Sequence, residues 1–260
     1  MNDMIPRLRM FAGPNGSGKS TVIKEVLHPK LLGIYLNADD IEKQIRQNPI
    51  FELADYPFDI QARELIAHFT QSDFLASAGL TAVIPLIKVS HHTAIDFSQI
   101  QFNSYFASVL VEFLRLQCLK HQASFTFETV MSSKDKVRFL AQAQALGYRT
   151  YLYFVATADP EINISRVNYR VQTGGHPVPE DKIRSRYYKT LHHLIDAINY
   201  SNRAYIFDNS AVFDRLAVLD KTGLVEQHSF IAEITEGKEL EIKSAQVPGW
   251  FKTYVLDRFI

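Results

Sequence analysis

The 260-residue sequence predicts an α/β fold in which a parallel sheet is covered by helices on both faces. Short apolar runs, typical of buried strands, alternate along the chain with longer segments that have helical periodicity. The chain is also long enough to bury a large core, and 47% hydrophobic with 22% charged residues is typical of a soluble globular protein.

The elements follow one another in a regular order. Apolar runs predict strands at 8–12, 34–36, 125–127, 151–155 and 204–207. Helical patterns follow at 22–28, 41–47, 134–146, 160–171 and 180–200, and another helix is expected at 104–121. Ser133 and Asp159 are expected to cap helices at their N-termini, and Gly147 to end one in the C′ position.

Two further segments stand apart from this alternation. The main domain is expected to span residues 1–210 and to carry a helical insertion at 51–103, with a helix at 61–77. Residues 211–260 are expected to pack on the same domain as a small antiparallel β extension. Its strands are predicted at 216–219, 230–235 and 240–242, before a helix from Trp250 to the end.

Composition excludes several classes of protein. Lys plus Arg and Asp plus Glu are both 28, so the net charge is zero and no nucleic-acid partner is expected. A single cysteine, Cys118, excludes an intramolecular disulfide and a multi-cysteine zinc site. No apolar run reaches about 18 residues, so no membrane span is expected. The first residues lack the apolar core of a signal peptide, which predicts a cytoplasmic protein.

The segment after the first strand carries the strongest motif. Gly13 to Ser20 fits the pattern G-x-x-x-x-G-K-[ST] in full, between a strand and a helix, which predicts a phosphate-binding loop and a P-loop NTPase fold. Lys19 is expected to neutralise the β- and γ-phosphates of ATP or GTP, and Ser20 to bind Mg²⁺. The alternative is a glycine-rich turn without a ligand. The predicted nucleotide-binding residues are Gly13, Pro14, Asn15, Gly16, Ser17, Gly18, Lys19, Ser20 and Thr21.

Carboxylates follow two other predicted strands. Asp39, after the second strand, would lie at the sheet edge where α/β proteins place their sites, as a general base for an acceptor hydroxyl. Its alternative role is helix capping, since Asp39 and Glu42 resemble a capping box. Glu128, after the third strand, would be costly to bury unless it met a cation or donors, which hydrated Mg²⁺ or the acceptor substrate would supply. The alternative for Glu128 is a surface position.

Arginines and an asparagine complete the set of candidates. Arg166 and Arg170 lie four residues apart, hence on one helix face, where they could stabilise charge on a transferring phosphoryl group. A solvated surface role is the alternative. Gly174 and Gly175 would provide the hinge of such a lid, and Asn209 closes the last parallel strand, where a loop could hold adenine.

Together these segments resemble the zeta-toxin family of P-loop kinases. The resembling pieces are GPNGSGKST at 13–21, NADDI at 37–41, FTFETVMSS at 125–133, GYRTYLYFVAT at 147–157, the run at 163–187 and FDNS at 207–210. The resemblance implies a nucleotide-kinase-like fold and a kinase that uses ATP or GTP with Mg²⁺. It also implies a small-molecule acceptor such as UDP-N-acetylglucosamine, phosphorylated on its sugar, and an antitoxin partner.

The resemblance also implies roles for individual residues. Lys19 and Ser20 would hold nucleotide and metal, Asp39 would be the general base, and Glu128 the strand-end acid. Arg170 falls near one transition-state arginine. A second family arginine falls near His176, so that Arg166, Arg184 or Arg186 are the candidates to replace it.

Other hypotheses fit the phosphate loop alone. An ABC-like ATPase would need an LSGGQ-like signature and an apolar strand that ends in Asp-Glu. The one Gly-Gly pair lies in Thr-Gly-Gly-His at 173–176, and the strand at 151–155 is followed by Ala-Thr-Ala-Asp. A nucleotide-binding regulator without transfer activity and an antibiotic-type phosphotransferase are the remaining alternatives.

Overall fold

The computed structural model describes residues 5–90, 93–173, 175, 177–210 and 229–259. The chain divides into two compact units. The first consists of Met1–Leu31 and Glu128–Ile260, and the second of Leu32–Phe127. The second unit is therefore inserted within the sequence of the first, and it is longer than the insertion expected from the sequence.

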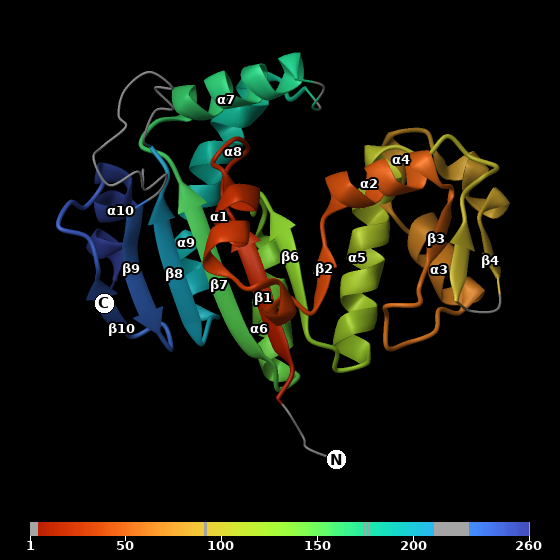
Figure 1. Cartoon of the computed structure of the whole chain (residues 1–260), viewed down its shortest axis with the longest axis horizontal. Coiled ribbons are helices and arrows are strands. Elements are labelled where there is room, and N and C mark those ends of the chain that lie inside the picture. Colours follow the sequence, from red (N-terminus) through yellow and green to blue (C-terminus); the bar gives the residue numbers. More distant parts are fainter. Residues whose placement is uncertain (1–4, 91–92, 174, 176, 211–228, 260) are drawn as a thin grey trace. The chain divides into compact units, whose positions relative to one another are not determined.

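The first unit is built on a mixed sheet whose strands run in the order β10-β9-β8-β7-β1 (Figure 1). The strands β1 (Arg7–Ala12), β7 (Arg149–Ala156) and β8 (Arg203–Asp208) are parallel neighbours. On the other side of β8, β9 (Ser229–Thr235) and β10 (Glu239–Ile242) continue the sheet in antiparallel pairs. The predicted parallel core and antiparallel C-terminal strands are both confirmed, while the strand expected at 216–219 lies outside the described residues.

Helices cover both faces of this sheet. Figure 1 shows α1 (Lys19–Val26) in front of it and α6 (Lys134–Ala145) with α9 (Leu194–Asn199) behind it. The unit also contains the short 3₁₀ helix η1 (Pro29–Leu31), then α7 (Pro160–Gln172), α8 (Glu180–His192), α10 (Gly249–Tyr254) and the 3₁₀ helix η3 (Leu256–Arg258). Strand residues on both faces are buried, because the adjacent residues Met10 and Phe11 in β1, and Phe154 and Val155 in β7, are all at 0% exposure. This burial explains why the strands read as continuous apolar runs.

Helix ends largely follow the sequence signals. Asp159 caps α7 by accepting a hydrogen bond from the N–H of Glu161 at 2.7 Å, and Gly147 follows α6 with a φ of 84°. Ser133 is the N-cap residue of α6, as predicted, although its hydroxyl donates to the Asp135 carboxylate and makes no hydrogen bond to a helix N–H.

Two predicted helices of the first unit are shorter than expected. The helix predicted at 180–200 divides at His193 into α8 and α9, although the buried apolar spacing continues through the division. The helix expected from Trp250 to the end stops at Tyr254 and is followed by η3. The Trp250 indole N–H donates to Asp208 Oδ2 at 2.7 Å, which fixes α10 to the end of β8.

The second unit contains a parallel pair and a small antiparallel sheet. Strand β2 (Ile34–Leu36) pairs with the start of β6 (Phe125–Thr129), and α2 (Ala38–Gln47) packs against α5 (Ser104–Lys120). Along the chain between α2 and α5 come α3 (Ala62–Thr70), α4 (Asp73–Ser77) and the 3₁₀ helix η2 (Thr81–Leu86). The strands β3 (Ile50–Glu52), β5 (Ala94–Asp96) and β4 (Lys88–Ser90) form an antiparallel sheet in the order β3-β5-β4.

The insertion expected at 51–103 therefore contains helices, as predicted, and also most of a small antiparallel sheet. Its strands are three residues long, too short for an alternating pattern to be recognised.

Within the described residues, no helix is both long and apolar enough to cross a bilayer.

Candidate functional site

The loop at residues 13–18 joins β1 to α1 in the first unit and packs closely on the elements beneath it. Gly13 has a φ of 152° and Gly18 a φ of 91°, in the region that favours glycine. A Cβ on Gly13 would lie 2.0 Å from the carbonyl oxygen of Val155 in β7. The glycines therefore let the loop turn and also let it approach the neighbouring strand.

The end of α1 that follows this loop is suited to an anion. Its N-cap, Gly18, provides no side-chain hydrogen bond, and its first turn contains no acidic residue. The first N–H groups of a helix have no partner within the helix and carry a partial positive charge. Because no side chain of the cap satisfies them, they fit phosphate oxygens, as the sequence motif predicts.

Lys19 lies folded over the loop. Its ammonium Nζ donates to the carbonyl oxygens of Gly13 at 2.8 Å and Pro14 at 3.0 Å. The hydroxyl of Ser17 is buried within the loop and has no hydrogen-bond partner among the described residues. A bound phosphate would provide acceptors for both groups, which supports the fit between this loop and a nucleotide.

Ser20 and Glu128 come together beside the loop. The Ser20 hydroxyl donates to Glu128 Oε2 at 3.0 Å, and the Glu128 residue is half-buried in β6. Mg²⁺ prefers oxygen ligands, and in phosphoryl-transfer sites it binds one or two protein groups together with phosphate oxygens. No group of three or more His, Cys, Asp or Glu side chains suited to a metal occurs in the described part of the chain. The Ser20–Glu128 pair therefore has the donor set for a metal shared with a nucleotide.

Asp39 belongs to the second unit and is not the cap of its helix. The Asn37 side chain caps α2 by accepting hydrogen bonds from the N–H groups of Asp39 at 2.9 Å and Asp40 at 3.3 Å. Glu42 is buried and pairs with Arg46 at 3.4 Å, so it does not complete a capping box with Asp39. The capping alternative for Asp39 is therefore wrong. Asp39 is exposed and lies in the first turn of α2.

The two candidate arginines on α7 differ in their surroundings. Arg166 is half-buried and donates from Nη1 to the backbone oxygen of Asn209 at 2.8 Å. Burial lowers the pKa of Arg166, and the carboxylate of Asp208 opposes that shift. Arg170 is exposed, and its Cγ would lie 2.6 Å from a Cβ placed on Gly175. Their catalytic roles stay predictions.

The other positively charged candidates are also partly accounted for. Arg184 on α8 forms a bidentate ion pair with Glu161 of α7, at 2.8 and 2.7 Å. This pair raises the pKa of Arg184. His176, and Gly174 in the expected hinge, lie outside the described residues.

Two asparagines contact the phosphate loop from beneath. Asn209 donates from Nδ2 to the carbonyl oxygen of Ser17 at 2.7 Å, so its side chain serves the loop, and a contact with adenine stays a prediction. Asn163 donates from Nδ2 to the carbonyl oxygen of Asn15 at 2.6 Å. Sequence reasoning missed Asn163. Its position beside the apolar Ile164 was a usable signal, because a polar residue next to a buried stripe needs a partner.

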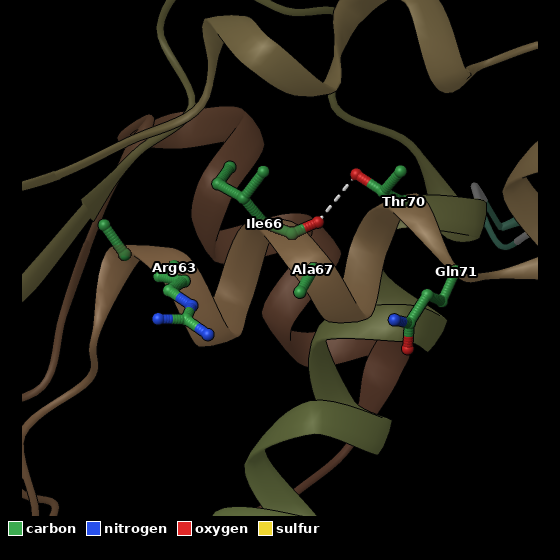
Figure 2. A pocket seen from close by; sticks show the side chains of 6 residues that line it. Arg63, Ile66, Ala67, Thr70 and Gln71 are labelled. Atoms are coloured by element: carbon green, nitrogen blue, oxygen red, sulfur yellow. Dashed lines mark hydrogen bonds between the residues drawn. The ribbon is translucent and has the colours of Figure 1, made fainter.

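A shallow hollow lies elsewhere, on the outer side of α3 in the second unit (Figure 2). Its lining comes from one helix and is mainly apolar, with Thr70 bonded to the Ile66 carbonyl oxygen at 2.8 Å. None of the predicted site residues lines it. The lining residues are Ala62, Arg63, Ile66, Ala67, Thr70 and Gln71.

Comparison with solved structures gives distant likenesses. The AvrRxo1-ORF1:-ORF2 structure with ATP is 12% identical with a TM-score of 0.50, covering 94% of this chain and 62% of that chain. A structure of the PezAT chromosomal toxin-antitoxin system of Streptococcus pneumoniae is 16% identical with a TM-score of 0.45, covering 87% of this chain and 76% of that chain. At these identities, the first likeness shows the fold alone.

Comparison of sequences is more informative about the family. An uncharacterized protein of Haemophilus influenzae is 29% identical over 69 residues, which are 26% of this chain. The matched segment spans about half of the length of that relative (49%). The model of the family described as "Zeta toxin" matches residues 94–229. Because this match takes in more than half of the chain, the protein belongs to the zeta toxin family.

Proposed function

We propose that this protein is a nucleotide-dependent small-molecule kinase, which transfers the γ-phosphate of ATP or GTP to a sugar hydroxyl. The acceptor we propose is a nucleotide sugar such as UDP-N-acetylglucosamine. The observation that supports this most directly is the Ser20–Glu128 pair, at 3.0 Å, beside a complete phosphate loop. A hydroxyl and a carboxylate next to a phosphate cradle are the groups needed to hold Mg²⁺ against a polyphosphate.

The candidate site residues of the first unit each have a part in this proposal. The phosphate loop and α1 would bind the phosphates, and Lys19 would leave the carbonyl oxygens of Gly13 and Pro14 to pair with the β- and γ-phosphates. Mg²⁺ would be held by Ser20, with Glu128 acting through a bound water, and would neutralise charge on the transferring group. Arg166 and Arg170 are proposed to stabilise the same charge.

Asp39 is proposed as the general base. A carboxylate can accept the proton of an acceptor hydroxyl as that hydroxyl attacks phosphorus. Asn37 satisfies the N-terminal N–H groups of α2, so the carboxylate of Asp39 is not needed as its cap.

The second unit is proposed to select the acceptor. It contains the predicted insertion, which has no counterpart in the quoted family motifs, and it presents the hollow on α3. Phe74 and Tyr105, exposed at 50% and 39%, lie with ring centroids 4.6 Å apart, which suits stacking on a planar base. Changes such as Ile66→Glu and Phe74→Ala should raise the acceptor KM more than the Kd for nucleotide.

The decisive experiment is a transfer screen with γ-labelled ATP and GTP, with and without Mg²⁺. The acceptors are nucleotide sugars, nucleosides, dinucleotides and aminoglycoside antibiotics. Label on a nucleotide sugar supports the proposal, and label on an antibiotic supports the phosphotransferase alternative. Nucleotide hydrolysis without any labelled acceptor would favour an ABC-like ATPase or a nucleotide-binding regulator and would contradict the proposed function.

An antitoxin partner is proposed because the protein belongs to the zeta toxin family. The test is growth of a host that expresses the protein, compared with a host that expresses Lys19→Ala. Toxicity that depends on Lys19 would indicate the need for a neutralising partner, whereas equal growth of both hosts would contradict it.

A further inference from the structure

We infer that Asn163 and Asn209 are positioning residues that fix two peptide planes of the phosphate loop. Through them, the N–H groups of Gly16 and Gly18 would be aimed at a bound polyphosphate. The inference rests on the proposed nucleotide-dependent function and adds Asn163, a residue outside the loop motif, to the groups that binding requires.

Asn163 is completely buried on α7 and uses both ends of its carboxamide. Its Nδ2 donates to the carbonyl oxygen of Asn15 at 2.6 Å, and its Oδ1 accepts from the hydroxyl of Thr157. A carbonyl oxygen can only accept, so these two contacts fix which end of the side chain faces the loop. The Tyr187 hydroxyl donates to the Thr157 carbonyl oxygen at 2.6 Å, which ties the arrangement to α8.

Asn209 is held as firmly at the end of β8. Its side chain is bonded to the Ser17 carbonyl oxygen at 2.7 Å, and the residue is 9% exposed. Its own N–H donates to the carbonyl oxygen of Ala156 at 2.8 Å. Its own carbonyl oxygen accepts from Arg166 at 2.8 Å. The backbone of Asn209 is therefore fixed from both sides before its side chain reaches the loop.

Peptide geometry converts these contacts into the direction of two donors. In a trans peptide, the carbonyl of one residue and the N–H of the next lie in one plane and point in opposite directions. The carbonyls of Asn15 and Ser17 are drawn toward the asparagines, so the N–H groups of Gly16 and Gly18 point the other way. Among the backbone hydrogen bonds of the turns, loops and helix caps in the described part of the chain, none has the N–H of Gly16 or Gly18 as its donor.

The glycines and the asparagines depend on one another. A Cβ on Gly18 would lie 2.2 Å from Nδ2 of Asn209, and a Cβ on Gly16 would lie 2.5 Å from the carbonyl oxygen of Asn163. The loop can rest on these two residues only because glycine has no side chain there. Donors fixed in advance toward the ligand need no reorganisation when it binds, which is the source of their contribution.

The test replaces each carboxamide by a carboxylate of the same size, in Asn163→Asp and Asn209→Asp. A carboxylate oxygen in place of Nδ2 faces a carbonyl oxygen and repels it. The Kd values for ATP and for inorganic tripolyphosphate should each rise roughly tenfold to a hundredfold. Tripolyphosphate isolates the loop, because it has no base or sugar. Lowering the pH should recover part of the affinity relative to wild type, since a protonated carboxyl group donates to a carbonyl.

Asn202→Asp is the matched control. Asn202 precedes β8 at the opposite end, where its carboxamide accepts from the N–H of Thr150 at 2.8 Å and donates to Glu236 at 3.0 Å. Its replacement removes a comparable bridge and should lower the thermal midpoint by a similar amount, with unchanged Kd for tripolyphosphate. Should an Asp variant fail to fold, Asn163→Ser and Asn209→Ser provide the same comparison, because a serine hydroxyl is too short to reach the loop.

The outcomes separate this inference from the proposed function. Folded variants that bind tripolyphosphate as wild type does would overturn the positioning role. So would a loss of affinity no larger than in Asn202→Asp. Wild-type binding of ATP without transfer to any acceptor would overturn the proposed kinase function while leaving the positioning role measurable by affinity. Failure of wild type to bind either ligand would overturn both.

Discussion

Ser20 donates its hydroxyl to Glu128 at 3.0 Å across 108 residues of sequence. The bond joins the first turn of α1 to the end of β6, and both groups are oxygen ligands suited to Mg²⁺. Two motifs far apart in the sequence thus meet at one place in the first unit, beside the phosphate loop.

Replacement of Glu128 should affect the metal more than the fold. In Glu128→Gln, the amide keeps the size of the side chain and loses the negative charge that attracts Mg²⁺. We expect phosphate transfer to fall roughly a hundredfold, as for removal of one preorganised charged group, and the Mg²⁺ concentration for half-maximal rate to rise. Magnesium titrations of turnover measure both. Glu25→Gln, on the exposed side of α1, is the control, and an unchanged magnesium dependence in Glu128→Gln would contradict the metal role.

Removal of the Lys19 ammonium should weaken binding of nucleotide phosphates. Lys19→Ala removes the charge that now contacts the carbonyl oxygens of Gly13 and Pro14. A loss of roughly 100-fold or more in transfer rate is expected from the magnitude of such preorganised contacts. Calorimetric titration with ATP and a transfer assay check this result. Lys24→Ala, five residues further along α1, should retain wild-type values, and retention of them by Lys19→Ala as well would refute the prediction.

Substitutions of Asp39 and of Asn37 should have different effects, one on phosphate transfer and the other on stability. Asp39→Asn should reduce transfer roughly a hundredfold, the scale of general-base catalysis, at an unchanged thermal midpoint. Asn37→Ala should instead lower the free energy of unfolding by about 1 kcal/mol, because it removes the acceptor for two N–H groups of α2. Asp40→Asn should be milder in transfer.

Turnover, ATP affinity and the thermal midpoint are measured for Asp39→Asn, Asn37→Ala and Asp40→Asn. A fully active Asp39→Asn enzyme would remove the general base from the proposed mechanism. A large loss of stability in that variant would instead indicate a structural role for the carboxylate.

His68 should make the second unit less stable in acid. Burial lowers the pKa of His68 in the folded protein from its ordinary 6.5, with Glu112 opposing and Arg115 adding to this shift. Below pH 6.5 the unfolded chain therefore takes up a proton that the folded chain does not, and stability falls as the pH falls. His68→Gln should flatten this dependence. Urea unfolding at pH 7.5, 6.5 and 5.5 measures it, and identical slopes for both proteins would exclude the contribution of His68.

Local signals allowed much of this structure to be predicted from the sequence. The phosphate loop is encoded by adjacent residues, and Asp159 and Gly147 mark helix ends through contacts within a few residues. The role of Asn163 could not be predicted, because it depends on a contact with Asn15, 148 residues away in sequence. The division at His193 was hidden because neither proline nor glycine marks it, while the apolar spacing of Leu191 and Leu194 continues through it.

The inserted order of the two units has a consequence for synthesis on the ribosome. The second unit, Leu32–Phe127, emerges complete while the phosphate loop still lacks β7, β8 and both asparagines. The partner of Ser17 at Asn209 is 192 residues further along the chain. At about 5–20 residues per second, it is made roughly 10–40 s later. The nascent chain therefore carries residues 13–18 through that interval without the Asn209 carboxamide that holds them, and we expect nucleotide binding to begin only after Asn209 has been made.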